Sequence, residues 1–268
     1  MRPRALTSLL ACLGIAACGA SEASPEPGLR RVRQFAAPAA RQAVAVGAHH
    51  FYAIDDRRIE QYARVSGERV ATWDAGDDAS IVHLNSGVVR EGLLYCAHSN
   101  FPAVPMRSSI EVFDAQTLAH RRTLPLPDAP GSATWVDHAH GRWWVAYAHY
   151  AGRGGVPGRG PEHSRLVAYD AAWRETQRYA YPEALIERFA GDSNSGGAFG
   201  PDGRIYATGH DAAEIYVLAP PAAGDTLLWL ETLPAPIAGQ GIAWDPARPG
   251  QLWGLVRDER RVVVMRAR

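Results

Sequence analysis

The sequence predicts an all-β fold, namely a β-propeller of five four-stranded blades over residues 29–268, with the last blade closed by an N-terminal strand. Three observations lead to this prediction. Two strand patterns each recur five times along the chain. Their spacing of roughly 45–60 residues is a propeller-blade period. The composition, with 26 Gly and 19 Pro, suits a turn-rich β protein, and few segments show helical periodicity.

The recurring patterns define the strands of each blade. An apolar strand with an aromatic side chain occurs at Phe51–Ile54, Leu94–Ala97, Trp143–Ala146, Ile205–Thr208 and Leu252–Leu255. A second apolar strand follows at Ile59–Tyr62, Ile110–Phe113, Leu166–Tyr169, Ile215–Leu218 and Val262–Met265. Inner strands are expected at Ala43–Val46, Ser86–Val89, Ser132–Val136, Gly196–Phe199 and Gly241–Trp244. Outer strands, such as Leu228–Thr232, complete the four-stranded unit.

The strand patterns at the two ends of the chain are both accounted for if the two segments share a blade. The last unit stops after its third strand, whereas Val32–Ala36 reads as an outer strand with no unit of its own. Pairing the two would remove exposed strand edges, which otherwise promote association. Six or more irregular blades, or an open β-sandwich, are the alternatives to this five-bladed arrangement.

The segment Ala198–Tyr206 contains Pro201-Asp202-Gly203, in which Pro fixes φ, Asp caps the turn and Gly takes the left-handed conformation. It resembles the blade repeats of the broad superfamily of NHL-repeat, YVTN-repeat and gluconolactonase-like propellers. The resemblance implies architecture and no activity, because such turns are not catalytic. Gluconolactonase-like enzymes use a carboxylate on the first inner strand, where Gln42 stands in this sequence.

Two smaller features complete the expected body. Pro182–Phe189 predicts a short helix between the third and fourth blades, since Pro suits a first helical turn and the apolar residues share one face. Cys96 is expected to be a buried strand residue. No internal disulfide is expected, because Cys12 belongs to the leader and Cys18 to the anchor described next.

The first residues predict export. Arg2 and Arg4 precede an apolar run over Ala5–Ala17, which is shorter than the roughly 20 residues that span a bilayer and suits a signal peptide. Its end, Ile15-Ala16-Ala17-Cys18, resembles the lipobox of bacterial lipoproteins. The resemblance implies a signal peptide over residues 1–17, cleavage before Cys18 and acylation of the Cys18 thiol. The alternatives are an ordinary signal cut after Ala20 or Ala23, or a buried N-terminal strand or helix.

Residues 18–28 are rich in small residues and Pro and predict a flexible tether between the anchor and the propeller. The expected location is therefore a bacterial membrane, facing the periplasm or the cell surface. Gly19, rather than Asp, follows the cysteine, and by resemblance to Gram-negative lipoproteins this favours the outer membrane.

The charge excludes one class of partner. The chain has 28 basic and 28 acidic residues, and removal of the leader takes away two arginines. Nucleic-acid-binding proteins normally carry a basic surface stripe, so no nucleic-acid partner is expected. The expected partners are the membrane, through the lipid anchor, and an unidentified small molecule, peptide or protein.

The candidate site lies at one mouth of the propeller, where loops leave the second strand of one blade and enter the first strand of the next. The candidate ligand-binding residues there are His83, Asn85, Ser86, His98, Asn100, His149, Asn194, His210, Asp211 and Gln240. A divalent metal held by His98, His149 and His210 is one hypothesis, because three His can hold zinc with an open fourth position. Rim residues hydrogen-bonded to loop backbone are the alternative.

Two functions follow from this interpretation. The first is a membrane-tethered binding or scaffold module, and the second is a metal-dependent hydrolase or lactonase-like enzyme with its site at the channel mouth. The sequence identifies no catalytic residue. The glycine-rich loop at residues 152–160 lacks the Lys-Ser/Thr of a phosphate loop, and neither a Gly-x-Ser-x-Gly nor a His-Glu-x-x-His motif occurs.

Overall fold

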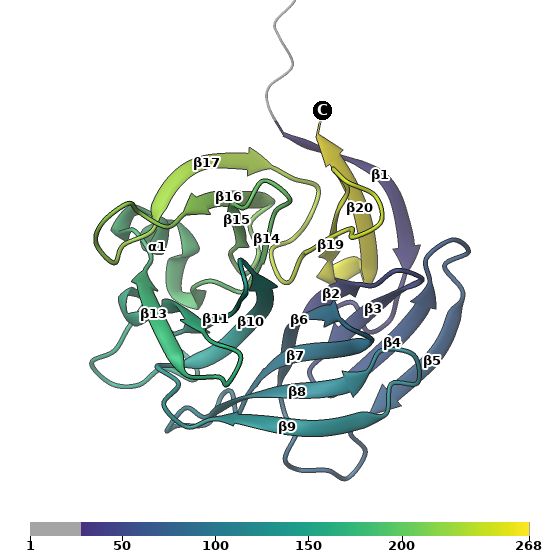
Figure 1. The fold of residues 1–268 in the computed structure, drawn as a ribbon, viewed down its shortest axis with the longest axis horizontal. Coiled ribbons are helices and arrows are strands. Elements are labelled where there is room, and N and C mark those ends of the chain that lie inside the picture. Colours follow the sequence, from purple (N-terminus) through teal and green to yellow (C-terminus); the bar gives the residue numbers. More distant parts are fainter. Residues whose placement is uncertain (1–27, 268) are drawn as a thin grey trace, which may run out of the picture.

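The computed structural model describes residues 28–267, so Cys18, the leader and nearly all of the predicted tether lie outside the described residues. Five antiparallel sheets of four strands each are arranged in a ring (Figure 1). The predicted five-bladed propeller is confirmed.

Each blade is numbered along the chain from its inner strand outwards. The first blade is β2 (Ala43–Val46), β3 (His50–Asp55), β4 (Arg58–Ala63) and β5 (Arg69–Asp74), and the second is β6 (Leu84–Arg90), β7 (Leu93–Ser99), β8 (Ser108–Asp114) and β9 (His120–Leu126). The third is β10 (Ser132–Ala139), β11 (Arg142–Ala148), β12 (Arg165–Tyr169) and β13 (Glu175–Ala180), and the fourth is β14 (Gly196–Phe199), β15 (Ile205–Thr208), β16 (Glu214–Ala219) and β17 (Leu228–Pro234).

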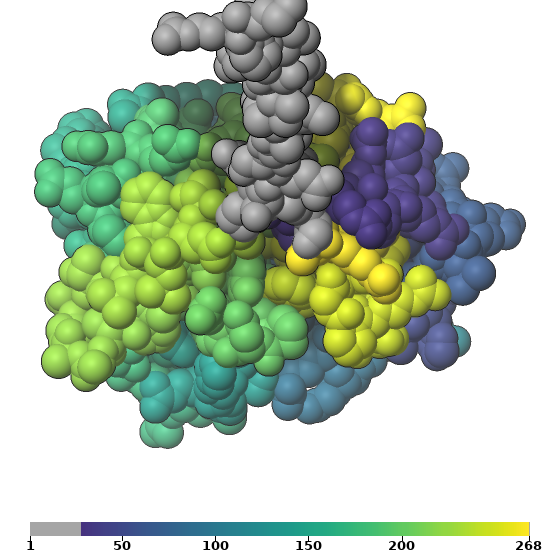
Figure 2. Space-filling model, turned by 90° about the horizontal axis from the view of Figure 1, so that it is seen from above, coloured from purple at the N-terminus to yellow at the C-terminus, as the bar shows by residue number. Residues whose placement is uncertain are grey.

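The fifth blade joins the two ends of the chain, as predicted. Its strands are β18 (Ala243–Trp244), β19 (Leu252–Val256), β20 (Arg261–Ala267) and β1 (Leu29–Ala36), in that spatial order. β1 pairs antiparallel with β20 from Leu29 opposite Ala267 to Ala36 opposite Arg261. Figure 2 shows the start of the purple N-terminal strand against the yellow C-terminal segment on the outside of the ring.

One inner strand is shorter than expected. Gly241 and Ile242 precede β18 instead of belonging to it, because the Gly241 amide bonds to the carbonyl of Gln42 in the neighbouring first blade at 2.9 Å. The prediction of a strand over Gly241–Trp244 was therefore wrong at its start. This bond links the fifth blade to the first around the channel.

The core lies between adjacent blades. The second and third strands of each blade are largely buried, whereas the outer strands β5, β9 and β13 are mostly exposed. Aromatic rings fill the blade interfaces; Phe51, for example, packs between Tyr62 at 4.9 Å and Trp253 at 5.2 Å. This burial of apolar area is the main stabilising contribution to the ring.

The smaller expectations are also met. The helix α1 spans Glu183–Phe189 after Pro182 and buries Leu185 and Phe189, and Cys96 in β7 is fully buried with a free thiol. Short 3₁₀ turns lie at Pro161–His163, Ala190–Asp192 and Arg257–Glu259. Within residues 28–267, no helix has the length and apolarity needed to cross a bilayer.

Candidate functional site

A cavity of about 500 Å³ opens at one mouth of the channel, and all five blades contribute to it. It is formed by the loops before each inner strand and after each second strand, which is the face that the sequence indicated. Entering loops and inner strands supply Gln42, His83, Asn85, Thr134, Asp192, Ser195 and Gln240, and the exits supply Asp56, Phe101, Tyr150, Arg153, His210 and Arg257. Of the predicted residues, the structure thus brings His83, Asn85, His210 and Gln240 together.

One wall of the cavity is organised around Asp56. Its carboxylate accepts hydrogen bonds from the Gln42 amide at 2.7 Å and from His83 Nδ1 at 2.7 Å. Burial raises the pKa of Asp56, but the bond and charge of His83, together with the bond from Gln42, outweigh burial and keep that pKa below its usual value. Asp56 is therefore a fixed anion that orients two donors at the cavity wall.

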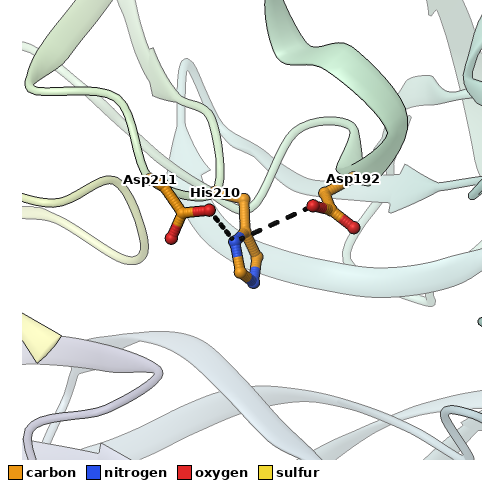
Figure 3. A group of neighbouring side chains, drawn as sticks. All are labelled: Asp192, His210 and Asp211. Carbon is orange, nitrogen blue, oxygen red and sulfur yellow. Dashed lines mark hydrogen bonds and ion pairs between the residues drawn. The ribbon is translucent and has the colours of Figure 1, made fainter. Parts of the chain in front are cut away.

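The cavity lining also includes His210, which lies between charged neighbours (Figure 3). Its Nδ1 lies 2.7 Å from Asp211 and 3.9 Å from Asp192, and Arg257 lies 2.9 Å from its Nε2. Because the guanidinium can only donate, Nε2 accepts and the proton sits on Nδ1, which it donates to Asp211. Asp192, His210 and Asp211 form a cluster whose candidate ligand atoms all lie within 4.8 Å of one another.

Two long loops supply residues that the sequence analysis did not single out. Phe101 packs against His83 at 4.9 Å and against Tyr150 at 5.0 Å, and the guanidinium of Arg153 lies over the Phe101 ring at 5.6 Å. Phe101 and Tyr150 begin the two loops that follow β7 and β11. The length of those loops was the available signal, since long ordered loops often line sites.

Two predicted ligand-binding residues are part of the packed interior instead. Asn194 is fully buried, its oxygen accepts bonds from Trp135 at 2.6 Å and Tyr181 at 2.8 Å, and its nitrogen donates to Gly196 and Thr208 at 2.9 Å each. Its amide has no hydrogen-bonding capacity left for a ligand. Ser86 is 1% exposed, and its hydroxyl has no hydrogen-bond partner among residues 28–267.

His98 and Asn100 line a separate cavity of about 650 Å³ beside the second blade. His98 accepts from the Val82 amide at 3.1 Å and contacts the Ser109 hydroxyl at 2.9 Å. Burial lowers the pKa of His98 to about 4, despite the opposing charge of Glu111. His98 is therefore a neutral, internally bonded imidazole at neutral pH.

His149 is also hydrogen-bonded within the protein. Its Nε2 bonds to the Pro130 carbonyl, and burial keeps its pKa below the usual value. Among residues 28–267, the only cluster of three or more metal-ligating side chains is Asp192, His210 and Asp211. The structure therefore does not bring His98, His149 and His210 together, and the three-histidine metal site is not formed.

The other end of the channel has a different character. A cavity of about 370 Å³ lies there, lined mainly by apolar residues such as Val46, Val88, Val136 and Phe199, together with Asp137. Burial raises the pKa of Asp137, although the amides of Phe199 and His138 both donate to its carboxylate. The two mouths thus differ in chemistry, and the polar one contains four of the predicted residues, namely His83, Asn85, His210 and Gln240.

These observations define a five-bladed propeller with a polar channel mouth. No protein-family model and no curated protein matches the sequence. Among solved structures, the chain is similar to the PQQ-bound form of an aldose sugar dehydrogenase from Streptomyces coelicolor, with a TM-score of 0.53 and 10% identity over 91% of this chain and 99% of that one.

Two further structures show a comparable likeness. A protein from Thermus thermophilus described as a glucose dehydrogenase has a TM-score of 0.52 and 12% identity over 90% of this chain and 100% of the other. A luciferin-regenerating enzyme has a TM-score of 0.50 and 9% identity over 90% and 95% of the two chains. At these identities the likeness shows the propeller fold alone.

Proposed function

We propose that this protein is a membrane-tethered extracytoplasmic propeller that binds a small polar molecule in its channel-mouth cavity. The observation that carries the proposal is the cavity itself, because all five blades contribute polar side chains to it. Binding sites commonly combine a concave surface with a few convergent polar groups. A purely scaffolding role would not require this convergence.

The lining favours a ligand that carries both a carboxylate and hydroxyl groups. Arg41 and Arg257 lie 4.0 Å from Asp55 and 3.7 Å from Asp211, respectively. Arg153, in contrast, has no carboxylate within 4.0 Å among residues 28–267. Guanidinium groups suit carboxylates. The amides of Asn85 and Gln240 add donors and acceptors that suit hydroxyl groups, and the Phe101 and Tyr150 rings offer apolar faces.

A thermal-shift screen tests this proposal. Hydroxylated acids such as gluconate and glucuronate should raise the melting temperature, because a ligand at 100 times its Kd adds about 2.7 kcal/mol of stability. Glucose should raise it less, because it has no carboxylate to pair with the arginines. Arg153→Gln should remove the shift, and Arg159→Gln, which alters an exposed residue of the same loop outside the cavity, should retain it. No shift with any acid, or an equal shift in both variants, would contradict the proposal.

The second candidate function is a metal-dependent hydrolase, and the cluster of Asp192, His210 and Asp211 favours it. A divalent ion would replace the proton on His210 Nδ1 and take one oxygen from each aspartate, and such an ion supplies an activated water for hydrolysis. In the same screen, zinc should raise the melting temperature, and His210→Ala should abolish the rise. His49→Ala, which alters an exposed residue outside this cluster, is the matched control.

Membrane attachment is the part of the proposal that rests on the sequence around Cys18. Cys18→Ser should release the protein from the membrane fraction or leave its leader uncut, since the thiol is the expected site of acylation. One acyl chain anchors marginally, whereas two or three hold stably. The measurement is fractionation followed by mass determination of the N-terminus. A Cys18→Ser protein that stays membrane-bound after losing its leader would overturn the anchor.

A further inference from the structure

A groove of about 290 Å³ on the outer side of the fifth blade is lined by five arginines and no acidic residue. Its lining residues are Arg30, Val32, Arg33, Arg64, Arg248, Gln251, Trp253, Val264 and Arg266. The chain contains no lysine, so every basic group here is a planar guanidinium. Figure 1 shows β1 and β20, which carry three of these arginines, side by side at the edge of the ring.

Neutral groups hold two of these guanidiniums in place. Arg33 donates to the carbonyl oxygens of Arg64 and Val65 and lies 4.4 Å from the centre of the Phe35 ring. With the Gln251 amide turned so that its oxygen faces the guanidinium, Arg266 donates to that oxygen at 2.8 and 3.2 Å. Carbonyls, an amide and a ring orient the guanidiniums without neutralising their charge.

The groove carries an excess of positive charge. Arg64 at its base pairs with the buried carboxylate of Asp245. For Arg30, Arg33, Arg248 and Arg266, no carboxylate lies within 4.0 Å among residues 28–267. Moreover, Arg30 lies directly opposite Arg266 in the antiparallel pair of β1 and β20, and like charges at that position are destabilising. An anion between the strands would relieve this repulsion.

We infer that this groove is a binding site for a phosphate group, separate from the channel-mouth cavity. Guanidiniums from β1, β20 and the segment before β19 approach one small space. Fork-shaped donors from several directions fit the oxygens of a tetrahedral phosphate, and arginine is favoured over lysine for such recognition. The groove has room for a phosphate with a small substituent and not for an extended ligand.

Two kinds of ligand can supply such a phosphate group, namely a soluble phosphate ester and a phospholipid head group. The membrane source rests on the proposed anchor: Leu29 follows Cys18 by eleven residues, and an extended chain covers at most about 3.3–3.6 Å per residue. The groove would then lie within roughly 40 Å of the acyl chains. The phosphate site itself does not depend on that anchor.

The test uses the purified Cys18→Ser protein, so that no acyl chain contributes. Calorimetric titration with inorganic phosphate at constant ionic strength should show binding that sodium chloride does not reproduce. Arg248→Gln combined with Arg266→Gln should weaken the affinity by about tenfold or more, since each charge-assisted bond is strong. Arg31→Gln alters an exposed residue of β1 outside the groove and should bind phosphate like the parent protein.

Co-sedimentation with vesicles separates the sources. If the protein binds phosphatidylglycerol vesicles but not phosphatidylcholine vesicles, and the double variant loses this binding, the ligand is a lipid head group. If the protein binds phosphate but no vesicles, the ligand is a soluble phosphate ester. In phosphate-free buffer the double variant should melt no lower than the parent, because like charges have been removed. Phosphate heats equal to those of chloride, or equal affinity in the double variant and the parent, would overturn the site. Arg153→Gln, in the other cavity, should not alter phosphate binding.

Discussion

Deleting Leu29–Ala37 should prevent the propeller from folding cooperatively, whereas deleting residues 19–27 should leave its melting temperature unchanged. The first deletion removes β1, the whole outer strand of the fifth blade, and exposes the edge of β20. It also removes Phe35, which stacks on Trp253 at 5.7 Å and packs on Phe51 at 4.8 Å. Losing one buried Phe costs about 3–5 kcal/mol, against a total stability of about 5–15 kcal/mol for a domain.

Circular dichroism melts and size-exclusion chromatography of both deletions, made in the Cys18→Ser protein, measure this difference. Phe35→Ala is the matched point variant, because it keeps the strand and its ladder but removes the ring. It should melt cooperatively at a lower temperature than the parent. If both deletions melted like the parent protein, closure of the ring by β1 would contribute nothing to stability.

The architecture could be predicted because each blade repeats a local pattern. The aromatic second strands and apolar third strands recur in all five blades, and the observed strands contain every one of the predicted segments of these two types. The shortened β18 could not be predicted. Its start is decided by the bond from the Gly241 amide to Gln42 of the first blade, a contact between residues almost 200 positions apart in the sequence.

The burial of two carboxylates in third strands could also not be predicted from the sequence. Glu60 in β4 is fully buried, and it accepts bonds from Tyr62 at 2.6 Å and from Arg69 at 2.7 Å. Glu111 in β8 is equally buried and accepts from Ser109 and Thr123 at 2.6 Å each. A charged residue in a strand is normally exposed, and only the surrounding donors make these exceptions tolerable.

The failure of the three-histidine site has a simple geometric reason. His98 lies inside β7, His149 follows the last residue of β11, and His210 lies two residues beyond the end of β15. The three positions relative to the strand ends therefore differ: one residue before the end, one residue after it and two residues after it. The sequence placed each His near a strand end but could not fix the offset, which depends on where each ladder stops.

The Asn-Ser-Gly motif occurs twice, at residues 85–87 and 194–196, and its two copies lie in different environments. In both motifs the glycine is required by close backbone contact: a Cβ on Gly87 would collide with the Tyr95 carbonyl, and one on Gly196 with the Gln240 carbonyl. The asparagines differ. Asn85 lines the cavity and makes one long bond of 3.4 Å to Ala133, whereas Asn194 makes four bonds in the interior.

Asn194→Ala should therefore destabilise the protein strongly, while Asn85→Ala should affect ligand binding and leave stability nearly intact. Removing the Asn194 amide leaves the indole N–H of Trp135 and the hydroxyl of Tyr181 without their acceptor in a fully buried site. An unsatisfied buried polar group costs about 1–3 kcal/mol, so we expect a loss of about 3 kcal/mol in the free energy of unfolding. Removing Asn85 breaks one weak bond and should cost less than about 1 kcal/mol.

Urea unfolding of the two variants measures the stabilities, and the thermal-shift screen with hydroxylated acids measures binding. The motif is the same in both, so the substitution and the Ser-Gly pair that follows it are matched. Asn85→Ala should unfold near the parent's urea midpoint and lose the shift that the acids produce, because its amide faces the cavity. Asn194→Ala should unfold at lower urea and still respond to the acids under conditions where it is folded. Equal destabilisation of the two variants would mean that Asn85 belongs to the packed interior, and the channel mouth would then lose a residue that favours it as the binding site.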